Sequence, residues 1–197
     1  MKDTKFYKYS TFLTSLIKNL EVTNSVNKLI DIDKSLDEII DIFRKAHSIT
    51  NKVMFIGNGG SAGMCSHLAT DLNKNGKIRS TAFNDGATLT CLGNDYGYEY
   101  VFQKQLEFHA QPGDVLVAIS SSGNSANIIK AVNYAKDVKN CKIITFSGFS
   151  RENGLKKLGD YNFYIPNKDY GFVEVGHLML FHTIIDTITG WKDTSPF

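Results

Sequence analysis

The chain has 197 residues, of which 42% are hydrophobic and 21% charged, with only three prolines; this composition suits one globular domain and excludes a disordered or low-complexity protein. The 22 Lys and Arg residues against 20 Asp and Glu leave a formal net charge of +2, which is too weak to indicate a nucleic-acid or membrane-binding surface. We therefore expect no nucleic-acid or membrane partner, and any anionic ligand should be small and locally bound.

The cysteines and the N-terminus bear on the cellular compartment. The three cysteines are odd in number and lack a CxxC spacing, so neither a disulfide framework nor a thiolate zinc cluster is indicated. The N-terminus is too polar for a secretory signal, and no apolar run reaches the roughly 18 residues of a membrane span. These features predict a cytoplasmic protein.

The predicted elements begin with a helical segment. Between residues 11 and 47, apolar residues recur at helical spacing without proline or glycine, which predicts two helices with a bend near residues 23–25. After Asn51, short apolar runs alternate with helix-length segments, a pattern typical of parallel strands covered on both faces. The predicted strands are 53–56, 81–83, 115–119, 142–146 and 161–165.

This order of elements predicts an α/β fold with a doubly wound, flavodoxin-like sheet of five parallel strands and N-terminal helices. We expect one domain over residues 1–197, in which residues 1–50 form a helical segment and residues 51–190 form the α/β core. Such sheets bind ligands beyond the carboxyl ends of their strands, so the chemistry should lie in the loops that follow the strands.

The loop after the first predicted strand is Gly57-Asn-Gly-Gly-Ser61, followed by a helix-like stretch over residues 62–72. Its glycines allow a tight turn with exposed N–H groups, and the helix N-terminus adds partial positive charge, so the loop can hold an anion without Lys or Arg. A tight turn without a ligand is the alternative.

The same loop fits GxGxxA, a weak form of the dinucleotide fingerprint, with Asp85 placed where an acid could meet a ribose. A nicotinamide-dependent oxidoreductase is therefore a further hypothesis. The chain has no room for a substrate domain, which argues against this hypothesis. The absence of a Walker lysine argues against a P-loop.

The loop after the third predicted strand is Ser120-Ser-Ser-Gly-Asn-Ser125, followed by a helix-like run over residues 126–136. Four hydroxyls around a glycine can surround a phosphate monoester, and Ser125 could cap the helix. A flexible serine-rich loop is the alternative, but its position between a buried strand and a helix favours phosphate. Neutral donors in both loops indicate a phosphorylated small molecule that binds reversibly.

Four polar residues on predicted helices could form a second site. His67 and Asp71 are four residues apart and share a helix face, and Glu174 and His182 lie within about 80° of each other on the last helix; His177 points elsewhere. Together they could form a metal site, for which zinc suits the oxygen and nitrogen ligands while other divalent metals stay open, or an acid/base pair. A solvated surface pair and a core histidine are the alternatives.

Four motifs follow one another along the chain: Gly57-Asn-Gly-Gly-Ser61, Gly93-Asn-Asp-Tyr-Gly-Tyr98, Pro112-Gly-Asp-Val-Leu116 and Ser120-Ser-Ser-Gly-Asn-Ser-Ala-Asn-Ile128. In order and approximate spacing they resemble the phosphoheptose (sedoheptulose 7-phosphate) isomerases of the sugar isomerase (SIS) fold, over residues 53–189. That family interconverts sedoheptulose 7-phosphate and D-glycero-D-manno-heptose 7-phosphate. Its members are typically homotetramers with zinc-dependent sites between subunits.

The resemblance implies a phosphorylated sugar substrate, one Zn²⁺ per subunit and a homo-oligomer, expected to be a tetramer. It implies His182 as proton-transfer residue, with Asp71 or Glu174 as the base, and an enediol(ate) intermediate. The implied metal ligands are His67, Asp71, Glu174 and His182. The implied substrate-binding residues are Asn58, Gly59, Gly60, Ser61, Asn94, Asp95, Ser120, Ser121, Ser122, Ser125 and Glu174.

Two positions depart from the family pattern. Asp71 stands where the family usually has glutamate, and Glu174 stands where it has glutamine. Compared with the family, the carboxylate at position 71 is shorter by one methylene, and position 174 carries a long carboxylate in place of an amide. The second change adds a negative charge near any metal. Besides the heptose isomerase, two hypotheses therefore stay open: an isomerase of another phosphosugar, and a non-catalytic SIS module that binds a sugar phosphate or a protein.

Overall fold

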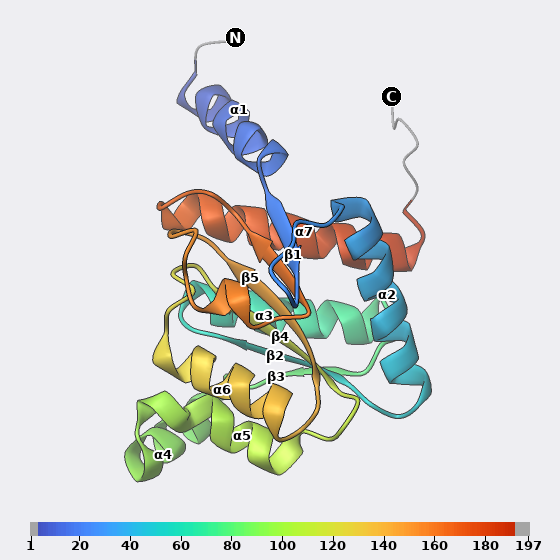
Figure 1. The fold of residues 1–197 in the computed structure, drawn as a ribbon, viewed down its shortest axis with the longest axis vertical. Coiled ribbons are helices and arrows are strands. Elements are labelled where there is room, and N and C mark those ends of the chain that lie inside the picture. Colours follow the sequence, from blue (N-terminus) through green and yellow to red (C-terminus); the bar gives the residue numbers. More distant parts are fainter. Residues whose placement is uncertain (1–3, 192–197) are drawn as a thin grey trace.

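A six-stranded sheet runs through the molecule, with helices on both of its faces (Figure 1). The structure is a computed structural model that describes residues 4–191. The strand order is β1-β6-β5-β4-β2-β3. The strands are β1 (Glu21–Asn24), β2 (Val53–Gly57), β3 (Ser80–Ala82), β4 (Val115–Ser120), β5 (Lys142–Ser147) and β6 (Tyr161–Tyr164).

Seven α-helices and two short 3₁₀ turns make up the rest of the described regular structure. The helices are α1 (Lys5–Lys18), α2 (Ile32–Ser48), α3 (Gly60–Lys74), α4 (Gly86–Tyr96), α5 (Val101–His109), α6 (Ala126–Asp137) and α7 (Tyr170–Thr189). The 3₁₀ turns are η1 (Tyr98–Tyr100) and η2 (Leu155–Lys157). Within residues 4–191, no helix is long and apolar enough to cross a membrane.

The five predicted strands are confirmed, and all of their pairings are parallel. Side chains alternate between two apolar clusters along β2: Val53 and Phe55 face one cluster, and Met54 and Ile56 face the other. The first cluster joins α2, α3 and α7 to one face of the sheet, while the second joins α4, α5 and α6 to the opposite face. Coverage of both faces explains why the central strands β2 and β4, buried along their whole length, consist almost entirely of apolar residues.

The prediction of a five-stranded sheet was wrong by one strand. Where the sequence predicted a bend between two helices, β1 pairs antiparallel with β6, with Glu21 opposite Tyr164 and Asn24 opposite Tyr161. Val22 and Thr23 are both buried and β-branched, which favours an extended backbone. Four residues are too few to show a period of two between helices. This strand covers the edge of β6, which would otherwise expose unpaired backbone groups.

Candidate active site

A cavity of about 240 Å³ opens at the carboxyl ends of β2 and β4. Two loops and the first turns of α7 form its walls. The glycine loop, residues 57–61, leads from β2 into α3, and the serine loop, residues 120–125, leads from β4 into α6. This is the edge at which a doubly wound sheet binds ligands. The lining residues are Asn58, Gly59, Gly60, Ser61, Ile119, Ser120, Ser121, Ser122, Ser125, Tyr170 and Glu174.

The glycine loop brings a carboxylate close to the N-terminus of α3. A Cβ atom at Gly60 would lie 2.7 Å from Glu174 Oε1, so a side chain at position 60 would displace the Glu174 carboxylate from the place that it occupies here. The Asn58 side chain forms a reciprocal amide pair with Asn127 at 2.9 Å and accepts a hydrogen bond from the Tyr98 hydroxyl at 3.0 Å. Asn58 therefore ties the glycine loop to α6 and to η1.

Side chains of the serine loop form hydrogen bonds within the loop, but one of its buried hydroxyls has no partner among the described residues. Ser120 Oγ accepts a hydrogen bond from Gly123 N at 3.2 Å and lies 3.4 Å from Ser125 Oγ. Ser125 occupies the N-cap position of α6, but the prediction that its side chain caps the helix was wrong, because that oxygen points at Ser120 instead. The buried Ser121 Oγ has no hydrogen-bond partner among residues 4–191, although most buried polar groups are paired.

The Ser121 hydroxyl should affect stability and binding in opposite directions. In Ser121→Ala we expect unchanged or slightly higher thermal stability, because a partnerless buried hydroxyl is removed, and phosphate affinity about 10- to 100-fold weaker, because a donor to a charged group is lost. Thermal melts and titration with inorganic phosphate measure both effects. Ser35→Ala is the control, because it removes a buried hydroxyl that does donate a bond, to Asp31 O: it should lose stability and keep its phosphate affinity. Full phosphate affinity in Ser121→Ala would contradict the prediction.

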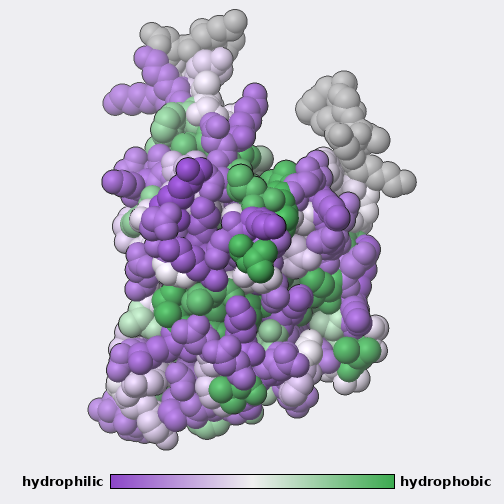
Figure 2. Space-filling model, viewed as in Figure 1, coloured by the Kyte–Doolittle hydropathy of each residue, from purple (hydrophilic) through white to green (hydrophobic). Residues whose placement is uncertain are grey.

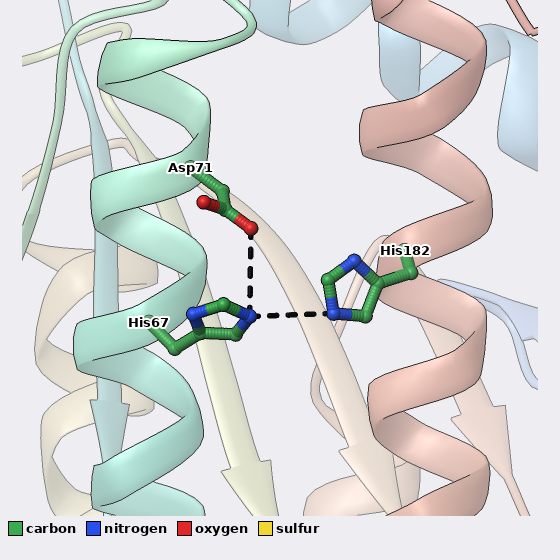
Figure 3. A group of neighbouring side chains, drawn as sticks. All are labelled: His67, Asp71 and His182. Atoms are coloured by element: carbon green, nitrogen blue, oxygen red, sulfur yellow. Dashed lines mark hydrogen bonds and ion pairs between the residues drawn. The ribbon is translucent and has the colours of Figure 1, made fainter.

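A second group of polar side chains lies farther along the helices, where α3 faces α7 (Figure 3). His67 and Asp71 project from α3 and His182 from α7, toward one another. His67 Nε2 lies 3.4 Å from His182 Nε2 and 3.4 Å from Asp71 Oδ2. The side chain of His67 is 53% exposed, so the cluster is open to solvent. The structure thus brings together three of the four residues that the resemblance implied as metal ligands.

The donor set of this cluster fits a divalent metal. One ligand atom from each of the three residues lies within 4.8 Å of the others. Ligands of a tetrahedral zinc ion, with bonds of about 2.0–2.1 Å, stand roughly 3.3–3.4 Å apart, which matches both distances from His67 Nε2. Two imidazoles and one carboxylate with an open position are also the ligand count of a catalytic zinc site.

Comparison with known proteins identifies the family. The SIS domain family model matches residues 19–148. The phosphoheptose isomerase of Helicobacter hepaticus is 36% identical over 189 residues, which cover 91% of this chain and 89% of that protein. The chain belongs to the phosphoheptose isomerase family of SIS proteins. A second phosphoheptose isomerase, from Aliarcobacter butzleri, is 39% identical over 145 residues, or 70% of this chain and 75% of that protein.

Solved structures agree with this assignment. The phosphoheptose isomerase of Neisseria gonorrhoeae superimposes with a TM-score of 0.73 at 27% identity, covering 95% of this chain and all of that one (100%). The fold is also shared with a phosphoheptose isomerase from Francisella tularensis, with a TM-score of 0.76 at 24% identity over 94% of this chain and 98% of that chain.

Glu174, Asn94 and Asp95, which the resemblance implied as site residues, do not lie in the cluster of His67, Asp71 and His182. Glu174 lines the cavity between the two loops, eight residues and about 12 Å along α7 from His182. Asn94 and Asp95 lie on α4, where Asn94 Nδ2 donates to Asp95 Oδ1 at 3.0 Å, and neither lines the cavity.

Asp85, the acid that the dinucleotide pattern placed near a ribose, has a structural role at the start of α4. It is the N-cap of α4, and its carboxylate accepts hydrogen bonds from Thr88 N and Thr88 Oγ1, both at 2.8 Å. These bonds hold the pKa of the Asp85 carboxyl below its usual value. Asp85 thus has a structural role as a helix cap, which weakens the dinucleotide hypothesis; that hypothesis rests on the GxGxxA pattern.

Sequence reasoning missed three residues of the site. Tyr170 lines the cavity, and Tyr98 and Asn127 hold Asn58. Tyr98 ends one of the four family motifs and Asn127 lies in another, so a signal was present for both. Tyr170 carried no sequence signal, because only the approach of α7 to the loops brings it there.

His177 is a buried, neutral histidine on α7 beside the end of β5. Its side chain is 1% exposed, and Nε2 donates to the carbonyl of Ser147 at 3.0 Å, while Nδ1 has no partner among the described residues. Burial lowers the pKa of His177 to about 4 from the usual 6.5, although the bond to Ser147 opposes this shift. The predicted separation of His177 from the other polar residues of α7 is confirmed.

This buried histidine predicts a pH-dependent stability. Between pH 6.5 and 4 the His177 imidazole is protonated in the unfolded chain but stays neutral in the folded chain. The free energy of unfolding should therefore fall by about 3 kcal/mol over that range. Above pH 6.5 both states are neutral and the contribution is constant. Urea unfolding at several pH values measures the loss, and His177→Gln should show a correspondingly flatter profile. Identical profiles for the two proteins would contradict the prediction.

Proposed function

We propose that this chain is an aldose–ketose isomerase that interconverts sedoheptulose 7-phosphate and D-glycero-D-manno-heptose 7-phosphate through an enediol(ate). The observation that carries the proposal is the separation of a phosphate-type cavity from the polar cluster. Gly60 and His67, and likewise Glu174 and His182, are about 10–12 Å apart along their helices. From phosphorus to C1, an extended seven-carbon sugar phosphate spans roughly 9–10 Å.

The two loops support phosphate binding at one end of this span. Neutral donors surround the cavity: backbone N–H groups at the start of α3 and the hydroxyls of the serine loop. Helix N-termini and serine hydroxyls hold a phosphate without a basic patch, in keeping with a net charge of +2. Glu174, at the same end, can accept hydrogen bonds from sugar hydroxyls.

Proton transfer belongs at the other end. Moving a carbonyl from C2 to C1 requires a base that removes a carbon-bound proton and an acid that protonates the oxygen. Asp71 shares the cluster with His182, whereas Glu174 lies at the phosphate end. We therefore assign the base to Asp71 and the partner acid/base to His182, with Glu174 in substrate binding.

Zinc is the metal that we propose for the cluster. His67, Asp71 and His182 would hold it, and when bound it would act as a Lewis acid toward the sugar oxygens. Glu174 lies about 12 Å along α7 from His182 and outside the cluster, which leaves three protein ligands in one chain.

We also propose a cytoplasmic homo-oligomer, in which a tetramer covers the open cluster. Figure 2 shows hydrophobic patches set among hydrophilic residues. The α1 helix projects beyond α7 (Figure 1) and exposes aromatic side chains. A partner that covered these rings would remove apolar surface from water. They belong to Phe6, Tyr7, Tyr9 and Phe12, which are 42–81% exposed.

The test is an isomerisation assay on ketose phosphates of five, six and seven carbons, with metal analysis of the purified protein. We expect bound zinc and the highest kcat/KM for sedoheptulose 7-phosphate. Faster turnover of a shorter ketose phosphate would favour the second candidate, an isomerase of another phosphosugar.

Absence of both metal and turnover would favour the non-catalytic SIS module, which the departures at Asp71 and Glu174 support. In that case inorganic phosphate or a sugar phosphate should still bind in the cavity.

A further inference from the structure

The segment that follows β5 supports the serine loop from outside the cavity. We call this segment, residues 148–156, the brace. It runs from the end of β5 into η2, and all of it after Gly148 lies beyond the residues that the SIS family model matches. Its backbone N–H groups donate to the serine loop at three points: Leu155 to Gly123 O at 2.8 Å, Gly148 to Ser121 O at 3.0 Å and Gly154 to Asn124 Oδ1 at 2.9 Å.

Asn153 holds the brace in shape. Its side chain is buried, with the residue 1% exposed. The Nδ2 group donates to Ser150 O at 2.8 Å and to both Gly148 O and Ser147 Oγ at 3.2 Å. Oδ1 accepts from Lys156 N at 2.9 Å. A buried amide with all of these bonds fixes the backbone around it.

The same side chain fits against the turn of the serine loop. Gly123 has a φ of +64°, which glycine adopts without strain. A Cβ atom there would lie 2.0 Å from Asn153 Oδ1, so Asn153 fills the space that a side chain at position 123 would need. The brace and the serine loop are thus complementary in shape as well as joined by hydrogen bonds.

An ion pair fastens the far end of the brace to the edge strand. Lys156, 8% exposed, places Nζ 2.8 Å from Glu21 Oε2 and 4.4 Å from the centre of the Tyr164 ring. Arg151 also pairs with Glu21. Burial raises the pKa of the Glu21 carboxyl, but its bonds to Arg151 and Lys156 outweigh this and lower the pKa below its usual value. Strand β1, which the sequence did not predict, therefore anchors the brace.

We propose that Asn153 is a positioning residue for phosphate binding: it fixes the serine loop in its binding shape before substrate arrives, and the ion pairs of Glu21 hold Asn153 in place. This inference rests on the proposed function in that the serine loop binds the phosphate. A loop that is already in its bound shape loses less conformational entropy on binding. Loosening the brace therefore weakens phosphate binding without touching the groups that transfer protons.

The test compares Asn153→Ala with Asn162→Ala. Asn162, in β6, is 0% exposed and equally bonded: it accepts from Thr145 Oγ1 at 2.8 Å and donates to Gly159 O at 3.0 Å. Its hydrogen bonds go to residues outside the brace and the serine loop, whereas Asn153 bonds within the brace and packs against Gly123. Both variants should lose thermal stability. Only Asn153→Ala should bind inorganic phosphate about tenfold more weakly and raise KM for sedoheptulose 7-phosphate to match, with kcat changed less than about threefold.

Glu21→Gln, which keeps the side-chain shape and removes the charge, should weaken phosphate binding about two- to threefold. If Asn153→Ala does not fold, this variant is the test, and unchanged phosphate affinity in it would overturn the inference. Unchanged phosphate affinity in Asn153→Ala, or an equal loss in Asn162→Ala, would overturn the inference. The phosphate titration does not depend on turnover. A wild type that binds phosphate but does not isomerise the heptose would contradict only the proposed function, whereas one that binds no phosphate would contradict both.

Discussion

Replacing His182 with alanine should lower kcat for sedoheptulose 7-phosphate about 10²- to 10⁴-fold, the usual contribution of a positioned acid/base group. The affinity for the phosphosugar should change only a few-fold, because His182 lies about 12 Å along α7 from Glu174, the residue of that helix that lines the phosphate-type cavity. Steady-state kinetics and equilibrium binding of the substrate separate these two effects.

His109→Ala is the matched control for this experiment. His109 is an exposed histidine at the end of α5, on the opposite face of the sheet from α3 and α7. Its removal should leave kcat unchanged. Unchanged turnover in His182→Ala would contradict the assignment of His182 to proton transfer. An equal loss of binding and turnover would instead place His182 among the residues that hold the substrate.

Replacing Phe181 with alanine should lower the free energy of unfolding by about 3–5 kcal/mol, the cost of a cavity where a buried phenylalanine stood. Phe181 is fully buried, and its ring centre lies 5.3 Å from that of Phe55 and 5.4 Å from that of Phe146. It attaches α7 to the sheet next to His182. For a chain of this size we expect the melting temperature to fall by roughly 6–20 °C.

Phe108→Ala serves as the control for Phe181→Ala. Phe108 lies on α5 and is 64% exposed, so its truncation should change stability by less than about 0.5 kcal/mol. Chemical denaturation of both variants gives the two free energies directly. Similar losses in both would contradict the view that Phe181 fixes α7.

The central strands could be predicted because each carries its own signal. Strand β4 is buried along its whole length and therefore reads as an unbroken apolar run. Strand β1 carries no such signal, because its four residues gain their stability from pairing with β6 and not from their own pattern. Its existence depended on a partner strand more than 130 residues away in the sequence.

The candidate site shows the same division. The glycine and serine loops were recognised because adjacent residues supply both the turn and the donors. His67 and Asp71 lie within one turn of one helix, so their proximity also followed from the sequence. The approach of His182 to His67, at 3.4 Å, depends on the packing of α7 against α3. The helical periodicity placed Glu174 and His182 on one side of α7, but the two residues lie about two turns apart along the helix axis.

The sequence by itself determined the strand and helix types of the α/β core, the two phosphate-type loops and the family motifs, because these depend on residues that are close together along the chain. Only the tertiary structure decided the sixth strand, the meeting of His67, Asp71 and His182, the place of Glu174 in the cavity and the contact of Asn153 with Gly123. Each of these depends on contacts between elements distant in sequence, which follow from how whole helices and strands bury their apolar faces together.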